Sequence, residues 1–152
     1  MLTEPAHDPA KRARTAAEEF AGRQRGEGYG LDFSEASVRV LERVVDAHAE
    51  LRVPESYGEL RAAPAAALDF VARAGAYLGE VARRHRGGSW AAGQSGAPFP
   101  VLRDAAGRPG QVFDPFRVIF DAVGAKDGGI VVARYMMMGG RVPDPGDATD
   151  VT

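Results

Sequence analysis

Six residues between positions 77 and 90 have side chains that could bind a ligand or a partner: Tyr77, Glu80, Arg83, Arg84, Arg86 and Trp90. Glu80 precedes Arg84 by four residues, which on a helix is the spacing of an ion pair that contributes about 0.2–0.5 kcal/mol. Alternatively, Glu80 could line a cleft for a small molecule together with Tyr77 and Trp90. No second carboxylate converges on Glu80 in the sequence, so paired acid–base chemistry is not predicted and no catalytic residue is assigned.

Arg83, Arg84 and Arg86 crowd the end of the same predicted helix. Cations at this position offset the negative helix end and donate to its free carbonyl groups. The cluster could also bind phosphate or an acidic protein. Nucleic acid is disfavoured, because no aromatic residues alternate with the cations and the formal net charge is −2. We therefore predict that reversing the three arginines to glutamate impairs function, whereas Glu80→Gln, at an exposed carboxylate, changes little.

Sites for metals, cofactors and nucleotides are not indicated. The chain has no cysteine, which excludes disulfides, thiolate ligands and thiol nucleophiles. His7, His48 and His85 are too widely separated to indicate a local metal site. The glycine-rich segments 87–96 and 124–128 lack the G-x-x-x-x-G-K-[S/T] order of a phosphate-binding loop, and no serine lies in G-x-S-x-G. We predict neither a metal nor a cofactor.

Gly75 and Gly79 lie four residues apart, on one side of the predicted helix, and leave a notch in its surface. Each glycine costs about 1 kcal/mol relative to alanine in a helix interior. Two such costs indicate that another group approaches closely, either Trp90, Tyr29 or the preceding helix. We predict that both glycines serve helix packing, that Gly79→Leu is destabilising and that Trp90 is buried against this helix.

The helix that carries these residues is predicted over residues 65–86 and ends at Gly87-Gly88. A second helix is predicted from an N-cap at Ser34 to about Arg52, because the residue before Pro54 avoids the helical conformation. Asp8-Pro9 indicates the start of a polar helix through Arg25. Phe20 is its only large apolar residue, so we expect this helix to be weakly docked.

The C-terminal half changes to a pattern of short strands and turns. Residues 89–92, 99–102 and 111–113 are predicted strands, and the last two are joined by a hairpin turn. Asp114-Pro115 repeats the cap and proline of a helix start, followed by a short helix to Val123. The apolar run 130–138 begins with β-branched residues, which favours a strand in its first half. Its three methionines, 136–138, are either divided between core and surface or form an adaptable contact surface.

These elements predict an α+β fold: about three main α-helices packed on a small antiparallel sheet, with a short additional helix after residue 114. Residues 1–30 are assigned to the polar N-terminal helix and a glycine-rich linker, 31–138 to a single α+β domain, and 139–152 to a disordered acidic tail. A chain of 152 residues can bury one sizeable core. Neither a signal-like start nor an apolar span is present, which predicts a cytoplasmic protein.

The order of these segments, with GAYLGEV, GGSW, PFPVLRD and VFDPFRVIFDAVGAKDGG as its markers, resembles a bacterial family of small domains of unknown function. In that family a G-x-x-x-G-E helix is followed by a strand that carries a tryptophan, a hairpin and a segment begun by proline. The resemblance covers about residues 32–138 and implies a compact α+β domain without a known activity. We expect a protein partner and an accessory or immunity-type role rather than an enzyme; a homodimer is left open.

Overall fold

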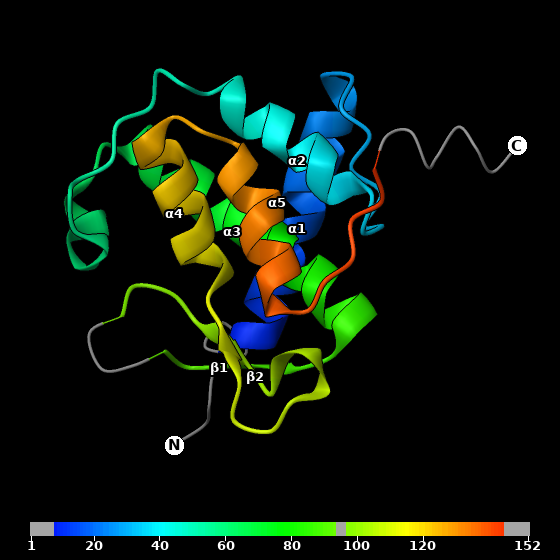
Figure 1. Ribbon diagram of the computed structural model, residues 1–152. Helices are drawn as coiled ribbons and strands as arrows, with labels where there is room; N and C mark the ends of the chain where they lie inside the picture. Colours follow the sequence, from blue (N-terminus) through cyan, green and yellow to red (C-terminus); the bar gives the residue numbers. More distant parts are fainter. Residues whose placement is uncertain (1–7, 94–96, 145–152) are drawn as a thin grey trace, which may run out of the picture.

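The computed structural model describes residues 8–93 and 97–144 of the chain (Figure 1). In these ranges the fold is α+β, as predicted, with five α-helices, two short 3-10 helices and three short strands. The elements in chain order are α1 (Pro9–Gly26), α2 (Ser37–Asp46), η2 (Tyr57–Ala62), α3 (Ala65–Arg86), β1 (Ser89–Ala91), β2 (Val101–Arg103), η3 (Ala105–Gly107), β3 (Val112–Phe113), α4 (Pro115–Ala125) and α5 (Gly129–Met138).

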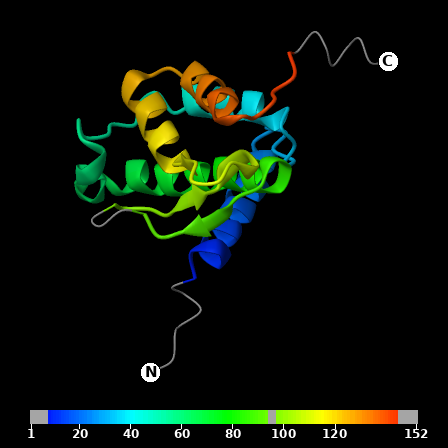
Figure 2. The same cartoon turned by 60° about the horizontal axis from the view of Figure 1, so that its bottom comes forward.

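Helix α3 forms the centre of the molecule and has the bounds that the sequence predicts. Figure 2 shows it between the strands on one side and a layer of α2, α4 and α5 on the other. Its most extensive packing is against α1 and α4. Gly87 and Gly88 follow it with φ values of 90° and 107°, a conformation that side chains other than glycine rarely adopt. The two glycines therefore end α3 and turn the chain into the sheet.

The sheet has the strand order β1-β2-β3, and both pairs of strands are antiparallel. Trp90 pairs with Leu102, and Leu102 pairs with Phe113, so these three side chains form one buried row. The neighbouring row, which ends at Val112 on β3, is exposed. This alternation follows from the two-residue period of a strand. The predicted hairpin between β2 and β3 is confirmed.

Two helices start as the sequence predicts, with an aspartate cap followed by proline. The carboxylate of Asp8 accepts a hydrogen bond from the Ala10 N–H at 3.0 Å, and the carboxylate of Asp114 accepts one from the Arg117 N–H at 3.1 Å. In both cases proline is the first helical residue, where its missing N–H has no intrahelical partner to lose.

Helix α1 is closely docked on α3, so the prediction of weak docking is wrong. Its buried face consists mainly of alanines, Ala13, Ala17 and Ala21, around the single large residue Phe20. Small side chains bury little area each, but they let two helix backbones approach closely. A count of large apolar residues therefore underestimates the packing of α1.

Helix α2 is shorter than predicted: it ends at Asp46 instead of near Arg52. The His48 imidazole Nδ1 lies 2.7 Å from the Val44 carbonyl oxygen, and the His48 N–H bonds to Val45 in a tighter turn. These interactions replace the next helical hydrogen bond. At the other end the Ser34 hydroxyl accepts from the Ser37 N–H at 3.1 Å. Helix α2 begins only at Ser37, and its N-cap position is Ala36, so Ser34 closes the turn before the helix and is not the predicted N-cap.

Residues 129–138 form helix α5 throughout, which corrects the predicted strand in the first half of this run. Its buried residues, Val131, Val132, Tyr135 and Met138, follow the helical period. The carboxylate of Asp127 accepts a hydrogen bond from the Gly129 N–H at 2.9 Å at the start of the helix. Packing against α2 and α4 thus outweighs the strand preference of the β-branched residues.

The described part of the segment after α5, residues 139–144, packs on the fold, although the sequence predicts a disordered tail from residue 139. Val142 is buried, and the Arg141 N–H donates to Glu35 at 3.1 Å. The rest of the predicted tail, 145–152, and the predicted loose start, 1–7, lie outside the described residues. In the ranges that are described, no helix has both the length and the apolar character that crossing a membrane requires.

Candidate functional site

The notch formed by Gly75 and Gly79 is filled by side chains from beyond α3. A Cβ atom on Gly79 would lie 2.5 Å from Trp90 Cζ2 and 3.0 Å from Pro115 Cγ. A Cβ atom on Gly75 would lie 2.8 Å from the Phe116 Cα. The distances to Trp90 and Phe116 are shorter than a Cβ atom can tolerate, so only glycine fits at either position. The predicted packing role of the two glycines is confirmed. Trp90 was among the expected occupants, whereas Phe116 was not foreseen.

Trp90 is buried against α3, as predicted, with 8% of its surface exposed. Its indole Nε1–H donates to Glu80 Oε2 at 2.8 Å, and its ring contacts Phe116 with 5.9 Å between centroids. The polar edge of the indole is therefore satisfied while its faces pack on apolar groups. Trp90 fixes the sheet to α3.

Glu80 is a buried carboxylate, which contradicts the expectation of an exposed, dispensable side chain. It accepts hydrogen bonds from Arg83 Nε and Nη2 at 2.8 and 3.0 Å, from Arg84 Nε at 3.3 Å and from Trp90. Burial by itself would raise the pKa of Glu80, but the bonds from Arg83 and Trp90 outweigh it and the pKa is lowered. Glu80 is thus held ionised as a structural centre.

The cluster of Arg83, Arg84 and Arg86 is occupied by carboxylates of the same chain. Arg83 and Arg84 both pair with Glu80, and the Arg84 guanidinium also lies 4.0 Å from the centre of the Phe33 ring. Arg86 forms two hydrogen bonds with the Glu35 carboxylate at 2.6 and 2.7 Å. All three arginines are therefore paired within the fold and are not an unpaired surface for an acidic partner. Arg84 and Arg86 also connect α3 to other segments, whereas Arg83 pairs within α3.

Glu35 connects four parts of the fold that are far apart in the chain. Besides Arg86 at the end of α3, it accepts hydrogen bonds from the Tyr135 hydroxyl on α5 at 2.7 Å and from the Arg141 N–H. Burial would raise the pKa of Glu35, but these donors outweigh it and lower the pKa from 4.5 to about 2.

The depressed pKa of Glu35 leads to a testable pH dependence. An ionised Glu35 stabilises the folded state above the unfolded pKa of 4.5, and this stability is lost as the pH falls toward 2. We expect Glu35→Gln to lower the free energy of unfolding at pH 7 by about 2 kcal/mol, with some of the pair's strength screened by solvent. Urea unfolding of wild type and variant at pH 7 and pH 3 measures this difference in the free energy of unfolding. A difference between wild type and variant that is as large at pH 3 would contradict this role.

Tyr77 does not join Glu80 and Trp90 in a common site. Its hydroxyl group lies 2.6 Å from the Ser37 hydroxyl and accepts from the Phe33 N–H at 2.9 Å, toward the start of α2. Burial raises the pKa of the Tyr77 phenol. Tyr77 and Glu80 have no exposed surface, and Trp90 has little, so the three residues leave no room for a ligand. The predicted cleft is wrong, because these side chains are core.

Exposed apolar side chains lie instead at β3 and the end of α5. Val112, Met136 and Met137 have 58, 48 and 78% of their surface exposed, and we call them the methionine surface. Val112 and Met137 line the same shallow cavity of about 360 Å³. Met138 is buried, so the three methionines are divided between core and surface, one of the two alternatives that the sequence left open.

Three arginines lie near Val112 and Met137 of the methionine surface. Arg117 and Arg134 line the same cavity and share one carboxylate, that of Asp121, at 3.2 and 3.0 Å. Arg103 lies opposite Val112 in the exposed row of the sheet and forms no ion pair within the described residues. Asp114 adds a carboxylate, but it is bound to the Tyr57 hydroxyl at 3.3 Å and burial raises its pKa. The rim is positive on balance.

No group of three or more metal-binding side chains is assembled among the residues that are described. Comparisons with protein-family models, curated proteins and solved structures found no match to this chain. The resemblance to a bacterial domain family therefore stays a prediction. The methionine surface was only partly visible in the sequence: the Met run was noted, but the exposure of Val112 and the cations around it depend on how β3 and α5 are placed.

Proposed function

We propose that the protein acts by protein–protein contacts, as a cytoplasmic accessory or immunity-type protein, and that the methionine surface makes these contacts. The observation that carries the proposal is the exposure of Val112 and Met137 in a cavity that charged residues also line, with the exposed Met136 next to Met137 in the chain. Exposed apolar patches with a polar rim are typical of protein interaction sites. Methionine side chains adapt their shape to a partner, which suits such a role.

The charge of the rim indicates the kind of partner. The two carboxylates of Asp121 and Asp114 neutralise only part of the positive charge of Arg103, Arg117 and Arg134. A partner with an apolar centre and carboxylates around it would complement both features. A second copy of this chain fits less well, because a twofold dimer would bring two positive rims together. The cations that we propose for recognition are thus not the three at the end of α3.

Binding experiments with matched variants test this proposal. Partners are captured from extracts of the native cell, identified, purified and titrated against wild type and variants. We expect Met137→Lys and Arg103→Glu each to weaken binding by about tenfold, since they act at the apolar centre and at the rim. Arg52→Glu is the control, because Arg52 is an exposed cation outside this surface. Its change in overall charge alone should alter the affinity less than about twofold.

The proposal fails if a purified partner binds Met137→Lys as tightly as wild type. Light scattering of the isolated protein adds a separate check on self-association. A wild-type dimer that Met137→Lys dissociates would identify the partner as a second copy of the chain. All three variants alter exposed side chains, so thermal unfolding should show little change and would reveal any folding defect.

A further inference from the structure

A groove runs between α1 and α3, separate from the methionine surface. It consists of two adjoining cavities of about 540 and 470 Å³ that share Arg12, Ala16 and Ala72. The groove exists because small side chains occupy its floor: Ala13 and Ala16 on α1, and Ala72 and Ala76 on α3. These alanines allow the close helix contact, but among residues 8–93 and 97–144 no side chain fills the space above them.

One end of the groove is apolar. Phe99 and Phe116 form its wall and stack on each other with 4.5 Å between ring centroids and 12° between planes. Pro98 and Pro100 extend this wall. The volume at this end falls within the roughly 300–1,000 Å³ that is typical of small-molecule sites. A hydrocarbon chain or an aromatic ring would be buried there against apolar atoms.

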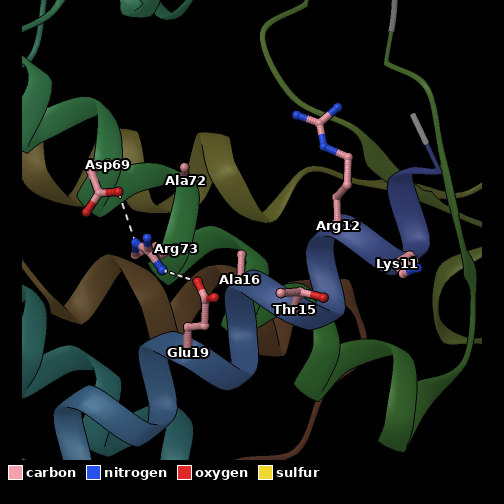
Figure 3. A pocket seen from close by; sticks show the side chains of 8 residues that line it. All are labelled: Lys11, Arg12, Thr15, Ala16, Glu19, Asp69, Ala72 and Arg73. Atoms are coloured by element: carbon pink, nitrogen blue, oxygen red, sulfur yellow. Dashed lines mark hydrogen bonds and ion pairs between the residues drawn. The ribbon is translucent and has the colours of Figure 1, made fainter. Parts of the chain in front are cut away.

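The other end is cationic, and its charges differ in how they are neutralised. Arg73 forms ion pairs with Asp69 at 2.9 Å and with Glu19 at 2.6 Å, so it is fully occupied (Figure 3). Arg12 and Lys11 form no ion pair with another described residue. Figure 3 shows the Arg12 side chain extending away from the Arg73 group. Arg12 lines both cavities, at the junction of the apolar and polar parts.

We propose that this groove binds a small aliphatic carboxylate, with the hydrocarbon chain along Phe99 and Phe116 and the carboxylate at Arg12. A planar guanidinium can donate two parallel hydrogen bonds to a carboxylate, which suits Arg12. Lys11 adds positive charge beside it. Asp69 and Glu19 would repel an anion near Arg73. The carboxylate of the ligand is therefore placed at Arg12 and not at Arg73. Neither the methionine surface nor the buried hydrogen bonds of Glu80 take part in this binding.

Titration with sodium decanoate tests this site, with Trp90 as the reporter. Trp90 is the only tryptophan and contacts Phe116, which lines the groove, so its emission should respond to binding. Calorimetry gives the affinity independently. We expect saturable binding of decanoate, binding of decanol about fivefold weaker because it lacks the charge, and no saturable binding of acetate, which lacks the chain.

Two kinds of variant separate the apolar and the charged contribution. Ala72→Phe should fill the groove and weaken decanoate binding by about tenfold or more, and Ala16→Phe should do the same from α1. Arg12→Gln should weaken decanoate binding by about fivefold and leave decanol unaffected. Arg14→Gln is the matched control, because Arg14 lies on the same helix, is exposed and lines neither cavity.

The outcomes decide the proposal directly. Decanoate binding that is unchanged in both phenylalanine variants would overturn it, as would equal affinities for decanoate and decanol in wild type. Equal effects of Arg12→Gln and Arg14→Gln would show that only the overall charge matters, which would also overturn it. If one phenylalanine variant is poorly folded by circular dichroism, the other one and Arg12→Gln still give the test.

Discussion

Gly79→Leu is expected to lower the free energy of unfolding by about 3 kcal/mol, at the upper end of the usual cost of overpacking. The position of the new Cβ is already taken by the Trp90 ring, 2.5 Å away at Cζ2, and by Pro115. A leucine therefore forces Trp90 off α3 and breaks its hydrogen bond to Glu80 as well. Chemical denaturation measures the stability. We expect a blue-shifted Trp90 emission in wild type, because the ring is buried, and a shift to longer wavelength in the variant.

Gly22→Ala on α1 is the matched control for this glycine effect. A Cβ at Gly22 would meet no atom within 4 Å, so alanine there should stabilise the protein by about 0.5–1 kcal/mol through helix propensity. The same change at Gly79 should destabilise instead. If Gly79→Leu leaves both the unfolding midpoint and the Trp90 emission unchanged, Trp90 does not pack in the notch.

Glu80→Ala is expected to destabilise the fold by about 3 kcal/mol, because it removes the common acceptor of a buried network. The indole N–H of Trp90 then has no partner in the core, while Arg83 and Arg84, about one third exposed, can turn toward water. Glu80→Gln keeps the shape but removes the charge, so it should cost less than alanine and more than a surface substitution.

Glu18→Ala provides the comparison for Glu80. Glu18 pairs with the same Arg84 at 3.8 Å, but its side chain is 60% exposed. Its loss should change the unfolding free energy by less than about 0.5 kcal/mol, as for other exposed pairs. Urea unfolding at pH 7 compares the variants. Equal effects of the two substitutions would mean that Glu80 is solvated in the folded protein.

The most conspicuous part of the sequence maintains the fold, with Tyr77, Glu80 and Trp90 buried and the three arginines partly exposed. Five of the six ligand or partner candidates, Glu80, Arg83, Arg84, Arg86 and Trp90, bind one another or Glu35. Tyr77 binds Ser37. Reversing the three arginines to glutamate would therefore impair function by unfolding the protein, and a loss of function in that variant would say nothing about a partner.

The sequence alone was sufficient for features that depend on neighbours along the chain. It predicted the bounds of α3, its end at Gly87-Gly88, the aspartate-proline starts of α1 and α4, and the β2–β3 hairpin. Caps, turns and helical periodicity involve residues a few positions apart, so their signals are local. The notch at Gly75 and Gly79 was visible for the same reason, although Phe116 as an occupant was not.

Only the tertiary structure decided which polar groups are buried and what they bind. Glu35 meets Tyr135 and Arg141 across about a hundred residues, and Glu80 meets Trp90 beyond the glycine break. Packing of α5 against α2 and α4 outweighs the strand preference of Ile130 and Val131. The alanines of α1 contribute to the core because α3 approaches them closely. Burial and charge pairing depend on contacts between distant segments, and no local pattern determines them.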